Sequence, residues 1–196
     1  MKYSTQLKSL AFALSLAVPF AVQAESSVAT GGGALSTSAH VDFSIVIPKV
    51  LFLRVGALGA GVDSIVFTVP AASVGNAIPI AGTGGDLTAG QVTATVQANS
   101  NGTVSLTALA TGALSDGAGD TINYSQITTA SNNPSFLAPV LTNGLSGAIT
   151  VPPVSKLVNQ TAVWTYSYAN GFVVPAGTYG GVNTNNGRVT YTASVP

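Results

Sequence analysis

The most regular pattern in the chain lies in residues 91–109, which read QVTATVQANSNGTVSLTAL. Apolar residues take every second position on both sides of the central Asn-Ser-Asn-Gly, and Thr, Gln and Ser fill most positions between them. A period of two is typical of β-strands that bury one face. The Asn101-Gly102 pair accepts the positive φ angles of a tight turn. The pattern therefore predicts a β-hairpin over residues 91–98 and 103–109.

Similar signals recur outward from this stretch. Strands are expected over residues 39–47, 50–55, 64–69, 122–127, 145–151, 162–168, 172–174 and 188–195, with a short edge strand at Ile78 and Ile80 and another strand beginning at Tyr179. Gly, Pro and Asn-Gly signals separate them, and helical apolar spacing is missing after the first 24 residues. Roughly nine short strands predict an all-β fold, an immunoglobulin-like antiparallel β-sandwich, with a closed barrel as the alternative.

The first 24 residues have the order of features that marks a secretory signal peptide. Lys2 and Lys8 precede an apolar run over residues 10–22, and Val22-Gln23-Ala24 forms a cleavage site of small residues. The run is too short to cross a bilayer, and no second apolar run is long enough. Residues 1–24 are therefore expected to direct export to the periplasm or cell surface, leaving no membrane span in the mature chain.

Two parts are expected after the signal peptide. Residues 25–38 are small, polar and Gly-rich, which predicts a flexible leader, and residues 39–196 are expected to form one β-sandwich domain. The mature chain has four basic and six acidic residues and no cysteine. So few charges exclude a nucleic-acid surface and a polybasic membrane patch. A surface of Thr, Ser, Asn, Gly and Ala suits a subunit that packs against neighbours.

Side chains for catalysis are scarce. His40 is the single histidine, and its place among Asp42 and Ser44 favours an outward strand residue over a general base. No second His or any Cys is present for a zinc site. Asp116 and Asp120 resemble a loose calcium loop, but the pattern of an EF-hand is not met and an acidic surface turn is the default interpretation. The sequence therefore predicts a protein that is not an enzyme and that holds no metal or cofactor.

Three aromatic residues share one face of an expected strand: Trp164, Tyr166 and Tyr168. Such a row can belong to the core, or it can form a platform that stacks on sugar rings. The second interpretation gives an alternative function, a secreted carbohydrate- or cell-wall-binding module, with these three residues as its glycan-binding site.

The N-terminal strand suggests self-association. Its apolar residues alternate up to Pro48, where the strand stops: Val41, Phe43, Ile45 and Ile47. A strand of this kind can add to an open sheet edge in another copy, with its alternate side chains filling pockets. It can equally be the first strand of its own sandwich.

Both ends of the chain resemble the cysteine-free major subunits of chaperone–usher fimbriae, the class that includes enterobacterial colonisation-factor pilins. The similar features are the signal peptide, the alternating strand that ends at Pro48, the apolar strand after it, and PAGTYGGV at residues 175–182 leading to the final strand. The likeness covers about a third of the chain, and the Gly-rich leader before residue 39 departs from it.

This resemblance implies a structural subunit that assembles into fimbriae or matrix fibres by strand complementation. Its partners would be copies of itself, a periplasmic chaperone and an outer-membrane usher. The subunit-binding residues would be those of the inserting strand, Val41, Phe43, Ile45 and Ile47.

Overall fold

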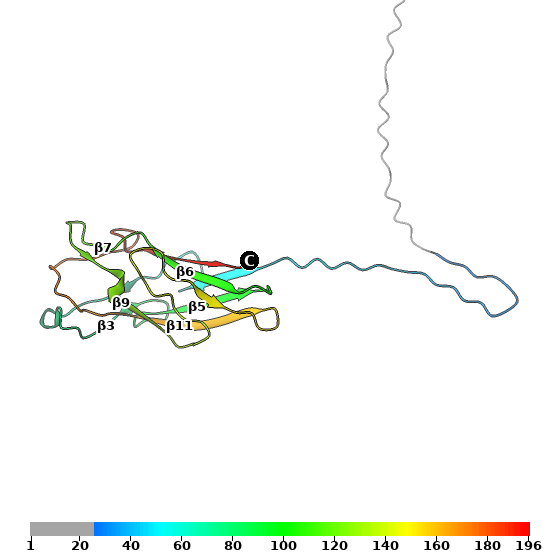
Figure 1. Cartoon of the computed structure of the whole chain (residues 1–196), viewed down its shortest axis with the longest axis horizontal. Coiled ribbons are helices and arrows are strands. Elements are labelled where there is room, and N and C mark those ends of the chain that lie inside the picture. The colour runs from blue at the N-terminus through cyan, green and yellow to red at the C-terminus, as the bar shows by residue number, and fades with distance from the viewer. Residues whose placement is uncertain (1–25) are drawn as a thin grey trace, which may run out of the picture. The chain divides into compact units, whose positions relative to one another are not determined.

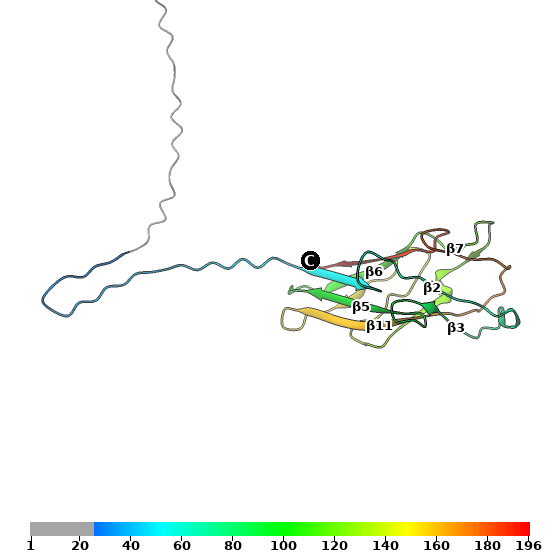
Figure 2. The same cartoon turned by 180° about the vertical axis from the view of Figure 1, so that it is seen from behind.

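The structure is a computed structural model that describes residues 26–196 (Figures 1 and 2). The expected signal peptide, residues 1–24, lies outside the described residues. The chain divides at the bond between Ile47 and Pro48, and residues Pro48–Pro196 form a compact β unit. Of the expected domain over residues 39–196, the compact unit contains Pro48–Pro196, and residues 39–47 precede it.

The larger sheet is built around two long strands. Strand β5 (Gln91–Ala98) pairs with β1 (Leu51–Val55) on one side and with β11 (Val158–Tyr168) on the other. The far half of β11 also pairs with β3 (Ile80–Ala81) and β9 (Ile127–Ser131). Every pairing is antiparallel, as the alternating patterns of these segments require when one face is buried.

The second sheet has three strands. Strand β6 (Val104–Ala110) lies between β10 (Ile149–Val151) and β12 (Val189–Ser194). Two small ribbons complete the strands: β2 (Ile65–Val66) with β4 (Thr83–Gly84), and β7 (Leu114–Ser115) with β8 (Thr121–Ile122). The helical residues among 26–196 form two short 3-10 turns, Ala71–Ser73 and Tyr124–Gln126. None of the helices in this part of the chain could cross a membrane.

The two sheets enclose one apolar core. Alternate residues of β5 are almost completely buried, and the same holds for β6. The two rows belong to different sheets and join a single cluster: Val92, Ala94, Val96 and Ala98 with Val104, Leu106, Ala108 and Ala110. The predicted all-β sandwich is thus confirmed, because two antiparallel sheets bury facing rows against each other.

The predicted hairpin over residues 91–109 is wrong, although both of its strands exist. Strand β5 belongs to the larger sheet and β6 to the smaller one, so the connection crosses from one layer to the other. Neither Asn101 nor Gly102 has a positive φ angle. The buried Ser100 instead accepts a hydrogen bond from the Gly102 N–H at 3.0 Å. A period of two identifies a buried face but leaves open whether its partner lies beside it or opposite it.

Four other expected strands also differ from the structure. Residues 122–127 contain the 3-10 turn Tyr124–Gln126 between the end of β8 and the start of β9. Residues 172–174 and the segment after Tyr179 form no strand, and residues 39–47 form none either. Residues 172–174 do not continue β11, which ends at Tyr168, because Asn170 has a φ of +52° that is incompatible with extended strand backbone. The predicted edge strand at Ile78 and Ile80 is present only as β3.

Asn170 is the most deeply buried polar residue of the sandwich, with 1% of its surface exposed. Its side-chain oxygen accepts from the Gly75 N–H at 3.0 Å, and its amide donates to the carbonyl of Ser73 at 2.6 Å and to the side chain of Asn76 at 3.0 Å. The side chain of Asn170 therefore connects the loop after β2 to the segment after β11 by three hydrogen bonds.

We expect Asn170→Ala to lower the free energy of unfolding by about 2–3 kcal/mol, because it leaves buried backbone groups unpaired and places alanine at a positive φ, which asparagine tolerates better. Urea denaturation measures this change. The exposed Asn101→Ala is the matched control and should change stability by less than about 0.5 kcal/mol. Equal free energies of unfolding for the two variants would contradict a stabilising role for the Asn170 hydrogen bonds.

Candidate functional site

The sandwich has an uncovered side where β1 and β12 meet. Among the strands of residues 26–196, β1 pairs only with β5 and β12 pairs only with β6. The two strands contact each other across the layers, and both views show them side by side near the C-terminus (cyan and red in Figures 1 and 2). We call the two free edges, Leu51–Val55 and Val189–Ser194, the β1–β12 seam. Each edge presents backbone donors and acceptors that no strand of the described chain uses.

The core is incompletely covered along this seam. No residue of β12 is fully buried, whereas alternate residues of β5 and β6 are. Apolar side chains from both strands and the chain end pack against the core but stay partly exposed: Leu53, Val55, Val189, Tyr191, Ala193 and Val195. An additional apolar strand along the seam would remove this surface from water, which is the favourable term in strand addition.

Asn99 holds the point at which the chain enters the sandwich. Its side-chain oxygen accepts from the Val50 N–H at 2.6 Å, and its amide donates to the Pro48 carbonyl at 2.8 Å. Its own N–H donates to the Val50 carbonyl at 3.3 Å. Lys49 donates to the carbonyl of Pro196, which joins the start of β1 to the end of the chain. The start of β1 and the end of β12 therefore lie at the same end of the sandwich.

The four proposed subunit-binding residues are exposed in an extended segment. Val41 is 74% exposed, Phe43 90%, Ile45 85% and Ile47 75%. Residues 39–47 pair with no strand of the described chain, so the expectation of a half-buried strand is not met within residues 26–196. His40 lies in this same exposed segment. The apolar alternation identified in the sequence is therefore a set of exposed side chains.

The aromatic row lies in the core, and the glycan-platform interpretation of Trp164, Tyr166 and Tyr168 is wrong. Trp164 is 0% exposed, and the other two are 6% exposed. The Trp164 ring lies 5.2 Å from the ring of Phe136 and 5.6 Å from that of Tyr191, and its indole N–H points to the Phe136 carbonyl at 3.3 Å. A buried ring offers no face to a sugar, so these residues stabilise the fold.

The two aromatic rings that contact Trp164, those of Phe136 and Tyr191, could not be identified as its partners from the sequence. Phe136 comes from an irregular segment with prolines on both sides, and Tyr191 comes from the opposite sheet. The Tyr191 hydroxyl lies 2.8 Å from that of Tyr166, and the pair joins the two layers. Tyr191 is also a seam residue, which links the stability of the core to the uncovered edge.

The acidic loop after β7 is organised by its own backbone. The Asp116 carboxylate accepts hydrogen bonds from the N–H groups of Ala118, Gly119 and Asp120 at 2.8, 3.1 and 3.0 Å. The bond from Ala118, followed by those from Asp120 and Gly119, lowers the pKa of Asp116. Within residues 26–196 no group of three or more His, Cys, Asp or Glu side chains could hold a metal ion. Asp116 thus caps a turn.

The chain matches no protein-family model, and comparisons with curated proteins and with solved structures give no match.

Truncating Trp164 separates a core role from a ligand-binding role. We expect Trp164→Ala to lower the free energy of unfolding by about 3–5 kcal/mol, because it leaves a cavity between Phe136 and Tyr191. Thermal and urea unfolding measure the loss. An exposed aromatic, Phe172, provides the control, since Phe172→Ala should be close to neutral. A stable Trp164→Ala variant would contradict the core assignment.

The tyrosine pair predicts a loss of stability in alkali. Burial raises the pKa of Tyr191 to about 12 and raises that of Tyr166 further, from an ordinary value of 10.0. Both hydroxyls therefore keep their protons in the folded state where the unfolded chain loses them. The contribution of these two tyrosines to the free energy of unfolding is therefore fully present below pH 10. The free energy of unfolding should fall as the pH rises from 10 towards 12. Urea titrations across this range measure the fall, and the Tyr166→Phe/Tyr191→Phe variant should show a smaller one. Identical profiles would contradict the prediction.

Proposed function

We propose that this protein is an exported structural subunit that assembles into fimbriae or matrix fibres by donating residues 39–47 to the β1–β12 seam of another copy. One observation carries the proposal: the same chain has an exposed, alternating apolar segment and a sandwich edge whose apolar lining is only partly covered. The proposal needs no catalytic residue and no cofactor.

The energetics favour such an exchange. Burying Val41, Phe43, Ile45 and Ile47 at about 1.5–3 kcal/mol each gives roughly 6–12 kcal/mol before the cost of ordering the segment. The seam residues would lose their exposed apolar surface in the same step. Main-chain hydrogen bonds to the free edge of β1 or β12 would then fix the register of the added strand.

The junction at Pro48 opposes donation to the seam of the same molecule. Both backbone groups of Val50 are bonded to Asn99, so Val50 cannot close a two-residue hairpin with Ile47. Pro48 has no N–H to offer, and a residue before proline is held extended. These features oppose a tight hairpin between residues 39–47 and β1, and so favour a second copy as the acceptor.

The low charge of the chain agrees with repeated contacts between copies. Residues 26–196 contain one salt bridge, Arg54 with Asp86 at 3.1 Å, and only 6% of the residues in the whole chain are charged. Like-charge repulsion between neighbouring copies is therefore weak. By its resemblance to chaperone–usher subunits, the protein would need a periplasmic chaperone and an outer-membrane usher to reach the cell surface. The alternative of an aromatic sugar platform is not retained, because its residues are buried.

A pair of substitutions on adjacent residues tests this function. Phe43→Asp places a charge on the face that would insert, and Ser44→Asp places the same charge on the opposite face. We expect mature wild-type protein and Ser44→Asp to form filaments in negative-stain electron microscopy, and Phe43→Asp to remain unassembled. Light scattering gives an independent measure of size.

Both substitutions lie outside the compact unit, so its unfolding curve should be unchanged in each and serves as the control. Filaments of Phe43→Asp indistinguishable from wild type would reject insertion of this face. A wild-type chain that stays monomeric at high concentration with its chaperone present would reject assembly altogether.

A further inference from the structure

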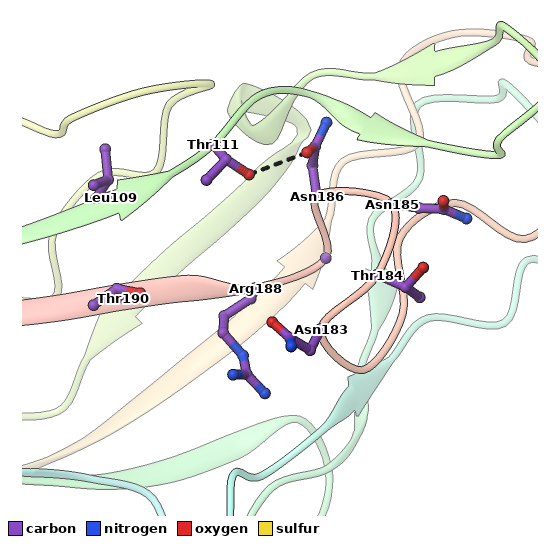
Figure 3. Close-up of a pocket in the computed structure, with 9 residues that line it drawn as sticks. Leu109, Thr111, Asn183, Thr184, Asn185, Asn186, Arg188 and Thr190 are labelled. Atoms are coloured by element: carbon purple, nitrogen blue, oxygen red, sulfur yellow. Dashed lines mark hydrogen bonds between the residues drawn. The ribbon is translucent and has the colours of Figure 1, made fainter.

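A cavity of about 290 Å³ lies on the outer face of the smaller sheet, where the loop before β12 folds over β6 and β12 (Figure 3). It is separate from the β1–β12 seam for two reasons. The cavity lies on the outer side of the smaller sheet, and it lies on the edge of β12 that pairs with β6, whereas the seam is formed by the opposite, unpaired edge of β12. Its lining is polar except for one leucine: Leu109, Thr111, Asn183, Thr184, Asn185, Asn186, Gly187, Arg188 and Thr190.

The loop over this cavity is held in a fixed shape. Asn183, Asn185 and Asn186 have φ angles of +56°, +48° and +57°, a region that asparagine tolerates better than most residues. Gly187 lies directly against Gly181, since a Cβ at Gly187 would fall 2.2 Å from the Gly181 carbonyl oxygen. Backbone conformations of this kind persist only where the surroundings impose them.

Asn186 supplies much of that constraint. Its side chain accepts from the Thr111 hydroxyl at 3.0 Å and donates to the Ala113 carbonyl at 2.9 Å. Its carbonyl accepts from the buried Tyr124 hydroxyl at 2.6 Å. The side chain of Asn186 therefore bonds the loop to the segment that follows β6, and it has little hydrogen-bonding capacity left for a ligand.

Three of the other polar groups of the lining point into solvent with their hydrogen-bonding capacity unused. Within residues 26–196 the exposed side chains of Asn183, Thr184 and Arg188 make no hydrogen bond or ion pair. Figure 3 shows Arg188 and Asn183 on the side of the loop away from the Asn186–Thr111 bond. No acidic residue lines the cavity, so Arg188 gives its lining a positive charge.

The lining combines three kinds of contact that a single ligand would use together. A guanidinium binds a carboxylate through two parallel N–H bonds. Amide and hydroxyl side chains pair with hydroxyl groups. Leu109 is a lining residue that is 45% exposed, and it offers a small apolar surface for C–H groups. The volume is close to the lower limit for small-molecule sites, which suits one terminal sugar residue.

We propose that this cavity binds a carboxylate-bearing sugar, of the hexuronic or sialic acid type, at the end of a glycan. Arg188 receives the carboxylate, Asn183 and Thr184 receive hydroxyl groups, and Leu109 contacts the ring. The site needs neither the donor segment nor the seam, so it stands or falls independently of assembly.

Ligand-observed NMR on the full mature protein tests the site with a matched pair of probes, glucuronic acid and glucose, which differ in one carboxylate. We expect glucuronic acid to bind at least tenfold more tightly than glucose. Arg188→Gln should abolish that preference, and Asn183→Ala should weaken the binding of both sugars. Lys156→Gln, which removes a cation from a distant turn, should leave binding unchanged.

Equal binding of the two sugars, or a preference that survives Arg188→Gln, would overturn the proposal. Competition by acetate as effective as that by glucuronic acid would overturn the assignment to a sugar, since it would leave only a bare carboxylate contact. Unfolding curves of each variant exclude loss of the fold, and Phe43→Asp should bind glucuronic acid as the wild type does.

Discussion

The structure depends on the burial of two facing rows of small and medium apolar side chains, one on β5 and one on β6. These strands lie at the centre of their sheets and follow each other in the chain, so their short connection sets the spacing of the layers. Once the rows face each other, β1 and β12 become outer strands on one side. Trp164 then packs in the core against the rings of Phe136 and Tyr191.

An uncovered edge is a liability that proteins usually limit with charges, bulges or covering loops. The β1–β12 seam has little of this protection: Arg54 is engaged by Asp86, and Lys49 is held at the end of the chain. The exposed segment with Phe43 at its centre has the alternation that such an edge accepts. An edge strand left open and an apolar segment left unburied are each unfavourable alone, and their combination in one chain is the physical basis of the proposed assembly.

The polar cavity lined by residues 183–188 lies at the opposite end of the sandwich from Pro48, where the chain enters it. The residues that looked suited to a sugar, Trp164, Tyr166 and Tyr168, are needed by the core. The loop over residues 183–188 instead gathers amide, hydroxyl and guanidinium groups over a small cavity. Separate places for assembly and for ligand contact would let each copy in a fibre present its own binding site.

The sequence by itself determined which residues form the central strands, because the alternation of side chains is a local property of extended backbone. Residues 91–98 and most of 104–110 follow directly from it. Only the tertiary structure decided their partners: the same alternation fits a hairpin and two opposed layers. In the fold, β5 pairs with β1 and β11 and β6 pairs with β10 and β12, which places the two strands in opposite layers. The tertiary structure likewise placed Phe136 and Tyr191 beside Trp164, since contacts between residues far apart in the chain depend on packing, which no local pattern records.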